Sequence, residues 1–298
     1  MQIGRVKGTK LLLNPYFLGL LIIYFLAGVI LKAAIVFGLV FYHELFHVLT
    51  ARSLGIRVSE IELLPFGGVA RMDDLLELKP ELELKVAVAG PLSNLLLLLA
   101  MIAARTYGLG SDLFWTSEAV QYLEKANILM LAFNLMPALP LDGGRIYRAF
   151  LVPRVGIQES TMLAAGMGKG LALVLSILGL AGLYFELTGL DFFIIAVFMF
   201  MATTRERARH WYVFLHSLTR KRQELFARGI LAANVLVGEE DALVKDVVSR
   251  FIPGKYHLVV VLNRQQQSRG WLDENQLIEG LLTRGYQVPL AVLMEEEQ

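Results

Sequence analysis

Long apolar runs separated by short polar connections occupy roughly the first two thirds of the chain. A helix that crosses the hydrocarbon core of a membrane needs about 20 mostly apolar residues. The runs that meet this requirement lie at approximately 15–31, 33–54, 84–104, 126–149, 162–186 and 188–203. Lys169 interrupts the fifth run and moves its expected span toward 170–186. The pattern predicts a polytopic α-helical membrane protein with about six transmembrane helices.

The basic N-terminus before the first apolar run is similar to a signal peptide, but no small-residue cleavage site leads into a polar mature domain. We therefore expect a signal-anchor helix. Lys and Arg concentrate at the N-terminus, in the connections 52–85 and 145–154, and after residue 204. By the positive-inside rule, both termini are predicted to be cytoplasmic.

Two other segments break the apolar pattern. Residues 55–83 alternate apolar and polar positions around Gly67 and Gly68, which predicts a β-hairpin or re-entrant element at the membrane surface. A solvated loop is the alternative. After Arg222 the composition becomes that of a soluble α+β unit, with Asp273 as the expected N-cap of a helix. The expected organisation is a transmembrane domain at 1–204, a linker at 205–222 and a C-terminal domain at 223–298.

Composition supports the membrane assignment and excludes several kinds of chemistry. The chain is 56% hydrophobic and 18% charged, with a mean hydropathy of +0.56, whereas soluble domains average about 25% charged residues. The net charge of +1 gives no bias toward nucleic acid. The absence of Cys excludes disulfides, thiolate ligands and a Cys nucleophile. A metal must therefore be held by His and carboxylate side chains.

The second apolar run contains the pentapeptide His43-Glu44-Leu45-Phe46-His47. Residues four apart lie on one helix face, so His43 and His47 can bind a single ion. Glu44 is then placed beside the metal, where it can take a proton from water. An uncompensated carboxylate at mid-membrane costs about 2.5–3.5 kcal/mol, which argues against a chance match.

A catalytic zinc needs a third protein ligand and one open position. The fourth run carries Pro137 and Pro140, which are expected to break its helix, followed by Asp142 on irregular backbone near the cytoplasmic end. Asp142 is the candidate third ligand. The alternative is an interfacial turn with a solvated carboxylate.

Two motifs together resemble those of the site-2 protease family of intramembrane zinc metalloproteases. They are His43-Glu-x-x-His47 and Asn134-x-x-Pro137-x-x-Pro140-x-Asp142-Gly143, and the stretch Ala89–Asn94 is similar to the family's small-residue segment beside the site. The resemblance implies that His43, His47 and Asp142 bind Zn²⁺ and that Glu44 activates water. We expect Gly90 and Asn94 to serve helix packing.

Within this family, the chain resembles the sporulation branch that processes pro-sigma-K. The shared features are LLPFGG (Leu63–Gly68), PLDGG (Pro140–Gly144) and LDEN (Leu272–Asn275). The resemblance implies a pro-sigma factor substrate, inhibitory membrane protein partners and a bacterial membrane, namely the outer forespore membrane with both termini on the mother-cell side. One alternative is a housekeeping protease acting on signal-peptide remnants or an anti-sigma factor. Another is a non-catalytic metal-binding scaffold, against which the intact Glu44 argues.

The C-terminal domain resembles a single CBS module, which implies binding of ATP or another adenine nucleotide. The alternative is a docking domain without a ligand. Because CBS modules usually work in pairs, one copy per chain suggests a homo-oligomer.

The substrate must present an extended segment, since a helix hides its carbonyls in hydrogen bonds. A sheet edge can hold such a segment by strand addition, and we expect this edge at residues 58–72, with Gly67 and Gly68 permitting close approach. Asn134 and Pro140 are the other candidate substrate contacts. Asn134 has an alternative role as a helix-bend partner for Pro137.

Overall fold

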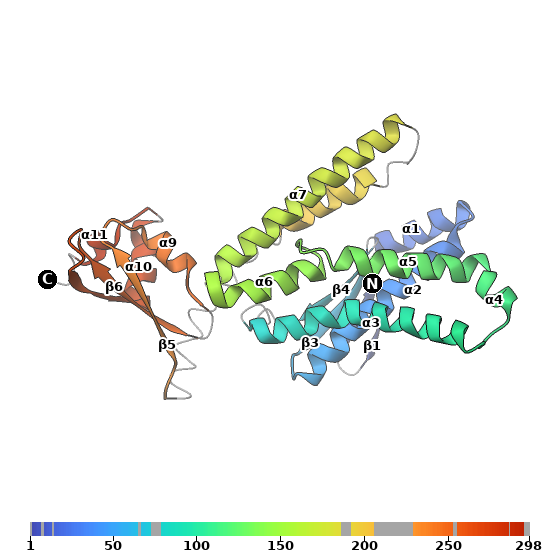
Figure 1. The fold of residues 1–298 in the computed structure, drawn as a ribbon, viewed down its shortest axis with the longest axis horizontal. Helices are drawn as coiled ribbons and strands as arrows, with labels where there is room; N and C mark the ends of the chain where they lie inside the picture. Colours follow the sequence, from blue (N-terminus) through green and yellow to red (C-terminus); the bar gives the residue numbers. More distant parts are fainter. Residues whose placement is uncertain are drawn as a thin grey trace.

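The fold combines a set of long helices, a four-stranded sheet formed near the N-terminus and a small C-terminal α+β domain (Figure 1). The computed structural model describes residues 2–6, 9–13, 15–64, 67–72, 79–185, 192–205, 229–252, 255–285 and 287–294.

The N-terminal sheet has the strand order β1-β2-β3-β4. Its strands are β1 (Gln2–Val6), β2 (Thr9–Leu13), β3 (Val58–Leu64) and β4 (Gly67–Met72). β2 runs parallel to β3, and the other neighbouring pairs are antiparallel. The predicted hairpin is confirmed, because Leu63 pairs with Gly68 and Leu64 with Gly67. The connecting residues 65–66 lie outside the described residues.

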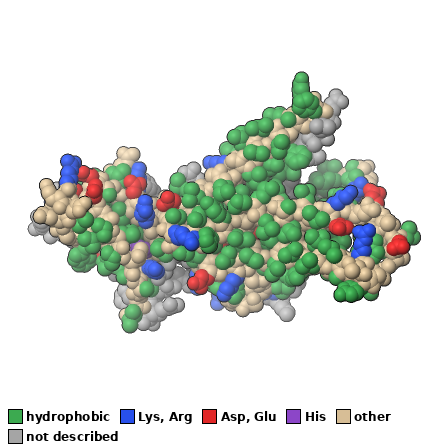
Figure 2. All heavy atoms as spheres, in the orientation of Figure 1, with side chains coloured by type: hydrophobic (Ala, Val, Ile, Leu, Met, Phe, Trp, Pro, Cys, Tyr) green, Lys and Arg blue, Asp and Glu red, His purple; other side chains and the backbone are tan. Residues whose placement is uncertain are grey.

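The helical region follows the apolar runs of the sequence. Its helices are α1 (Pro15–Leu26), α2 (Ile30–Ser53), α3 (Pro80–Thr106), α4 (Asp112–Thr116), α5 (Glu118–Asn134), α6 (Asp142–Val155), α7 (Ile157–Tyr184) and the helix Phe192–Arg205. Among the described residues, α2, α3 and α7 are long and apolar enough to cross a membrane, whereas the apolar helix Phe192–Arg205 is shorter. Hydrophobic side chains cover much of the visible face over these helices, while many charged side chains lie toward its two ends (Figure 2). These features fit a polytopic helical membrane protein.

Two helices differ from the sequence prediction. The fourth apolar run is divided between α5, which ends at Asn134, and α6, which begins at Asp142. The break at the two prolines is thus confirmed, but Asp142 is the first residue of a helix and does not lie on irregular backbone. α7 also continues through Lys169. The Lys169 ammonium lies 5.8 Å from the centre of the Phe200 ring, and an aromatic face is a favourable place for a cation.

The C-terminal domain contains a three-stranded sheet in the order β5-β6-β7, with β5 parallel to β6 and β6 antiparallel to β7. Its elements are β5 (Ala233–Glu239), α9 (Val244–Ser249), β6 (Tyr256–Leu262), β7 (Ser268–Asp273), α10 (Glu274–Arg284) and α11 (Leu290–Met294). Asp273 caps α10, as predicted, and accepts a hydrogen bond of 2.8 Å from the Gln276 backbone N–H.

The core of this domain extends beyond its own elements. Val152 of α6 and Ile157 of α7 belong to the same buried cluster as Val248 and Phe251. The C-terminal domain therefore packs on the corner where α6 meets α7. Figure 1 shows this corner on the side of the helical region that faces the C-terminal domain.

Candidate metal centre

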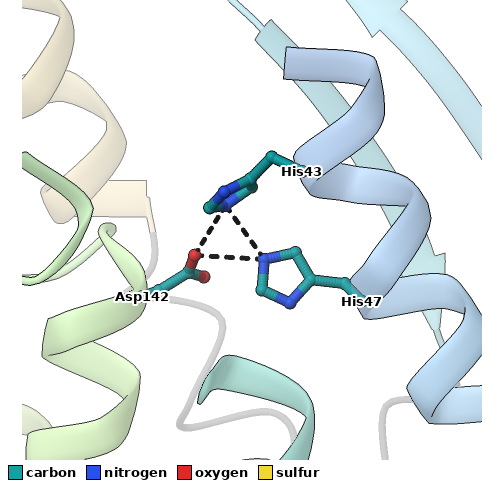
Figure 3. A group of neighbouring side chains, drawn as sticks. All are labelled: His43, His47 and Asp142. Carbon is teal, nitrogen blue, oxygen red and sulfur yellow. Dashed lines mark hydrogen bonds and ion pairs between the residues drawn. The ribbon is translucent and has the colours of Figure 1, made fainter. Parts of the chain in front are cut away.

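Three buried side chains from two helices converge at one point. His43 and His47 project from α2, one turn apart, and Asp142 faces them from the start of α6 (Figure 3). Asp142 Oδ2 lies 2.8 Å from His43 Nε2 and 3.0 Å from His47 Nε2, and the two Nε2 atoms are 3.1 Å apart. Their exposed fractions are 3%, 3% and 7%.

The donor set fits zinc. Two imidazole nitrogens and one carboxylate oxygen are typical zinc ligands, and tetrahedral bonds of about 2.0–2.2 Å place ligand atoms about 3.3–3.6 Å apart. The observed separations of 2.8, 3.0 and 3.1 Å are somewhat shorter than this range. Three protein ligands also leave one position for water or substrate, which is the pattern of catalytic zinc sites. Within the described part of the chain, no other cluster of three ligating groups is found.

Hydrogen bonds on the far side of each imidazole orient the two rings. His43 Nδ1 lies 2.5 Å from Asn94 Oδ1, and His47 Nδ1 lies 2.7 Å from the Val86 carbonyl oxygen. Because both partners accept hydrogen bonds, we assign the ring proton to Nδ1. The Nε2 lone pairs then face the common centre, as a ligating histidine requires.

Asn94 is itself fixed by a second asparagine. Its Nδ2 donates to Asn127 Oδ1 over 2.7 Å, while Asn127 Nδ2 donates to the Asn94 carbonyl over 2.9 Å, and both side chains are fully buried. Asn94 therefore has a further contact beyond the helix packing expected of it, since it also orients a candidate ligand. Neither asparagine's contact was visible in the sequence, because it depends on which faces of α2, α3 and α5 meet.

Gly90 of α3 provides the space in which the imidazoles meet. A Cβ atom at this position would collide with the Nε2 atoms of both His43 and His47. This close approach extends the expected packing role of Gly90, because a side chain there would displace both imidazoles.

A buried ion pair joins the two sides of the site. Arg148 of α6 contacts Glu83 of α3, with exposed fractions of 1% and 3%. α6 carries Asp142, and α3 carries the groups that orient the histidines. The pair therefore fixes the helix of one ligand to the helix that positions the other two.

The remaining predicted site residues are not among the three clustered ligands. Glu44 follows His43 on α2, is partly buried and interacts electrostatically with His47 and Asp142. Gly67 and Gly68 begin β4, which contacts α2. Asn134 ends α5, where its Nδ2 donates to the Met130 carbonyl over 3.1 Å, so the structure does not bring it into the ligand cluster. Pro140 is partly buried in the loop that leads to Asp142.

Comparisons with known proteins show first which class of protein this chain is similar to. Residues 31–114, which contain both histidines and Asn94, match the model of Peptidase family M50. The solved structure of a site-2 protease from Methanocaldococcus jannaschii superposes with a TM-score of 0.55 at 28% identity, over 70% of this chain and 94% of that chain. Residues 31–114 are thus similar to M50 peptidases, and the described fold is similar to that of a solved site-2 protease.

Particular relatives carry related names. Zinc metalloprotease MJ0392 of M. jannaschii is 35% identical over 59% of this chain and 47% of its own length. Putative zinc metalloprotease Rip3 of Mycobacterium tuberculosis is 32% identical over 72% and 54%. This chain thus spans about half the length of these two relatives. Stage IV sporulation protein FB of Bacillus subtilis is 24% identical over 80% of each chain.

Proposed function

We propose that this chain is an intramembrane zinc metalloprotease in which His43, His47 and Asp142 hold the metal. The convergence of their three ligand atoms, each within 3.1 Å of the other two, carries this proposal. When bound, zinc supplies Lewis-acid chemistry, making water nucleophilic near neutral pH and polarising a carbonyl. The setting restricts substrates to segments that can enter the membrane, since α2 is an apolar candidate span.

Glu44 is the proposed general base. Its carboxylate takes a proton from the attacking water and passes it to the amide nitrogen of the leaving peptide. It lies one residue beyond His43, beside the ligands, and remains available because the donor set is complete without it.

The deciding experiment compares wild type with Glu44→Gln in a cleavage assay, with bound zinc measured in parallel. We expect Glu44→Gln to retain zinc and to lose at least about a hundredfold in cleavage rate, the lower range for general base catalysis. Intact cleavage would refute the assignment. The same assay separates a protease from a metal-binding scaffold, because a scaffold shows no cleavage in the wild type either.

The substrate is proposed to add as a strand to β4. Among the described strands, β4 pairs only with β3, and β3 is already paired on its other side with β2. The free edge of β4 is therefore the docking position nearest to α2 in this sheet, and Gly67 and Gly68 place no side chain against an incoming backbone. This sharpens the expected 58–72 edge to a single strand.

Asn134 and Pro140 are kept as proposed substrate contacts because Asn134 precedes the loop that leads to Asp142 and Pro140 lies within that loop. The hydrogen bond from Asn134 to Met130 favours the role in the helix bend. Substrate binding by Asn134 predicts that Asn134→Ala raises KM, whereas a bend role alone predicts a loss of stability at unchanged KM.

We propose a pro-sigma factor, with pro-sigma-K as the first candidate, as the substrate. The resemblance at Leu63–Gly68 and Pro140–Gly144 and the similarity to stage IV sporulation protein FB over 80% of each chain support it. The alternative is a signal-peptide remnant or an anti-sigma factor. Co-expression of wild type or Glu44→Gln with each substrate class discriminates them, since only the true substrate is cut in a Glu44-dependent way.

The cellular setting follows from the same proposal. Both termini would be cytoplasmic, in a bacterial membrane that is the outer forespore membrane if the sporulation substrate is correct, with inhibitory membrane proteins as partners. Protease accessibility of tags at the two ends, in inverted and right-side-out vesicles, tests the orientation.

The C-terminal domain is proposed to be CBS-like, with boundaries near 205–222 for the linker and 223–298 for the domain. The order strand, helix, strand, strand, helix in β5 to α10 supports the assignment. Most of the proposed linker lies outside the described residues. ATP titration of the full-length protein tests the nucleotide proposal. The oligomeric state of the same protein, measured with and without ATP, tests the homo-oligomer proposal.

A further inference from the structure

Within the described part of the chain, two hydrogen bonds that hold the loop between α5 and α6 from outside meet at one residue, Leu139. Leu139 precedes Asp142 by three positions and is completely buried. Its backbone N–H donates to the Ala164 carbonyl of α7 over 3.1 Å. Its carbonyl accepts a hydrogen bond of 2.8 Å from Thr203 Oγ1, in the helix Phe192–Arg205. Two helices that contribute no candidate metal ligand therefore hold the backbone three residues before Asp142.

The neighbouring helices are shaped for this contact. Gly168 of α7 lies against the same carbonyl, and a Cβ atom there would collide with Leu139 O and would crowd Thr203 Oγ1. Leu139 also packs in one buried cluster with Ala164 and Ala165. Small residues on α7 thus bring the loop within reach of the threonine hydroxyl.

Thr203 makes a different bond from the threonine next to it. In a helix, a threonine hydroxyl commonly bonds the carbonyl four residues earlier. Thr204 does this, donating to the Phe200 carbonyl over 2.8 Å at an exposed position. Thr203 is fully buried and donates to another segment. Its hydroxyl therefore fixes the loop and not its own helix.

We propose that Thr203 is a positioning residue for the metal centre. Its hydrogen bond fixes the Leu139 carbonyl and so sets where α6 begins and where Asp142 meets the two histidines. The Arg148–Glu83 pair fixes α6 two turns further along, so Asp142 lies between two anchored points. This inference rests on the proposed zinc site, because it concerns the placement of one of its ligands.

The test is zinc affinity, measured by chelator competition on the folded fraction of the full-length protein in nanodiscs. Thr203→Val keeps the side-chain shape and removes the donor, and we expect zinc affinity to fall by about tenfold, as for other groups that orient metal ligands. Thr203→Ser keeps the hydroxyl and is expected to bind zinc as wild type does. Thr204→Val is the matched control, because it removes the adjacent hydroxyl without touching the loop.

A purely structural role would lower the melting temperature of the metal-free protein and leave zinc affinity unchanged, and that result in Thr203→Val would overturn the proposal. If Thr203→Val does not fold, Thr203→Cys replaces it, since a thiol is a weak donor. An affinity below that of wild type then supports the proposal, and wild-type affinity overturns it.

Asp142→Asn separates the hypothesis of the zinc site from the hypothesis that Thr203 positions it. If Asp142→Asn retains zinc, the proposed site itself is wrong, whereas loss in Asp142→Asn but not in Thr203→Val refutes only the role of Thr203.

Discussion

Among the described residues, buried histidines occur in two regions, and their surroundings differ in one decisive respect. In the C-terminal domain, His257 is fully buried and stacks on Phe251, with ring centres 4.2 Å apart and an interplanar angle of 5°. Its Nε2 accepts the Ile252 N–H over 3.0 Å, and its Nδ1 lies 3.2 Å from Glu274 Oε2. Both ring nitrogens are therefore used within the domain.

On α2, the two nitrogens of each ring have different surroundings. Nδ1 bonds to a group that lies away from the cluster, whereas Nε2 points into it. The Nδ1 atoms of His43 and His47 bond to Asn94 and to the Val86 carbonyl, while both Nε2 atoms meet Asp142 at one point. Burial and a nearby carboxylate are common to both regions. What distinguishes the candidate metal site from a core histidine whose hydrogen bonds are all satisfied is that the two Nε2 atoms converge on one point.

The largest expected effect comes from removing a converging nitrogen. His47→Ala should abolish stoichiometric zinc and lower cleavage by at least about a thousandfold, because the metal contributes several kcal/mol to transition-state stabilisation. Metal content by mass spectrometry and a cleavage assay on the same sample check this. Full zinc content in His47→Ala would break the comparison.

A smaller effect is expected from the outward side of the ring. Asn94→Ala removes the acceptor for His43 Nδ1 and should weaken zinc binding by about 10–100-fold without abolishing it. Ser93→Ala is the matched control, because the Ser93 hydroxyl donates to the Gly90 carbonyl within α3 over 2.7 Å. Equal zinc affinities in the two variants would show that Asn94 does not orient the ligand.

The smallest effect on the metal site is expected from the C-terminal histidine. His257→Ala leaves the Ile252 N–H and Glu274 without this partner and should cost about 1–3 kcal/mol of stability, the usual penalty for a buried polar group that loses its hydrogen bond. Zinc content should remain that of wild type. Thermal unfolding and metal analysis of the full-length protein check both parts, and a loss of zinc would mean that the two regions are not independent.

The sequence predicted the parts of the site that lie within one helix. The spacing of His43 and His47 places them on one face of any helix, so no tertiary information was needed. The hairpin of β3 and β4 and the cap at Asp273 were also local patterns and were confirmed. Asp142 could be proposed from the sequence because prolines interrupt an apolar run directly before it. Its place at the start of α6 was not predicted.

Contacts between distant segments were not predictable in this way. β1 and β2 are five residues each, too short to show an alternation that distinguishes them from a basic leader, and β2 is paired with a strand about fifty residues later. Asn94, Asn127 and Thr203 are ordinary polar residues in apolar runs. Their roles depend on the rotation of α3, α5 and the helix Phe192–Arg205 about their own axes.

The sequence by itself thus predicted the apolar helices and placed two candidate metal ligands and a proposed base on one helix, because helical periodicity relates neighbours at fixed distances. The tertiary structure alone decided that Asp142 meets both histidines, which nitrogens face the centre and which residues hold them there. Those features require α2, α3 and α6 to pack with one particular set of faces in contact, and that choice is made by the whole buried interior rather than by any local pattern.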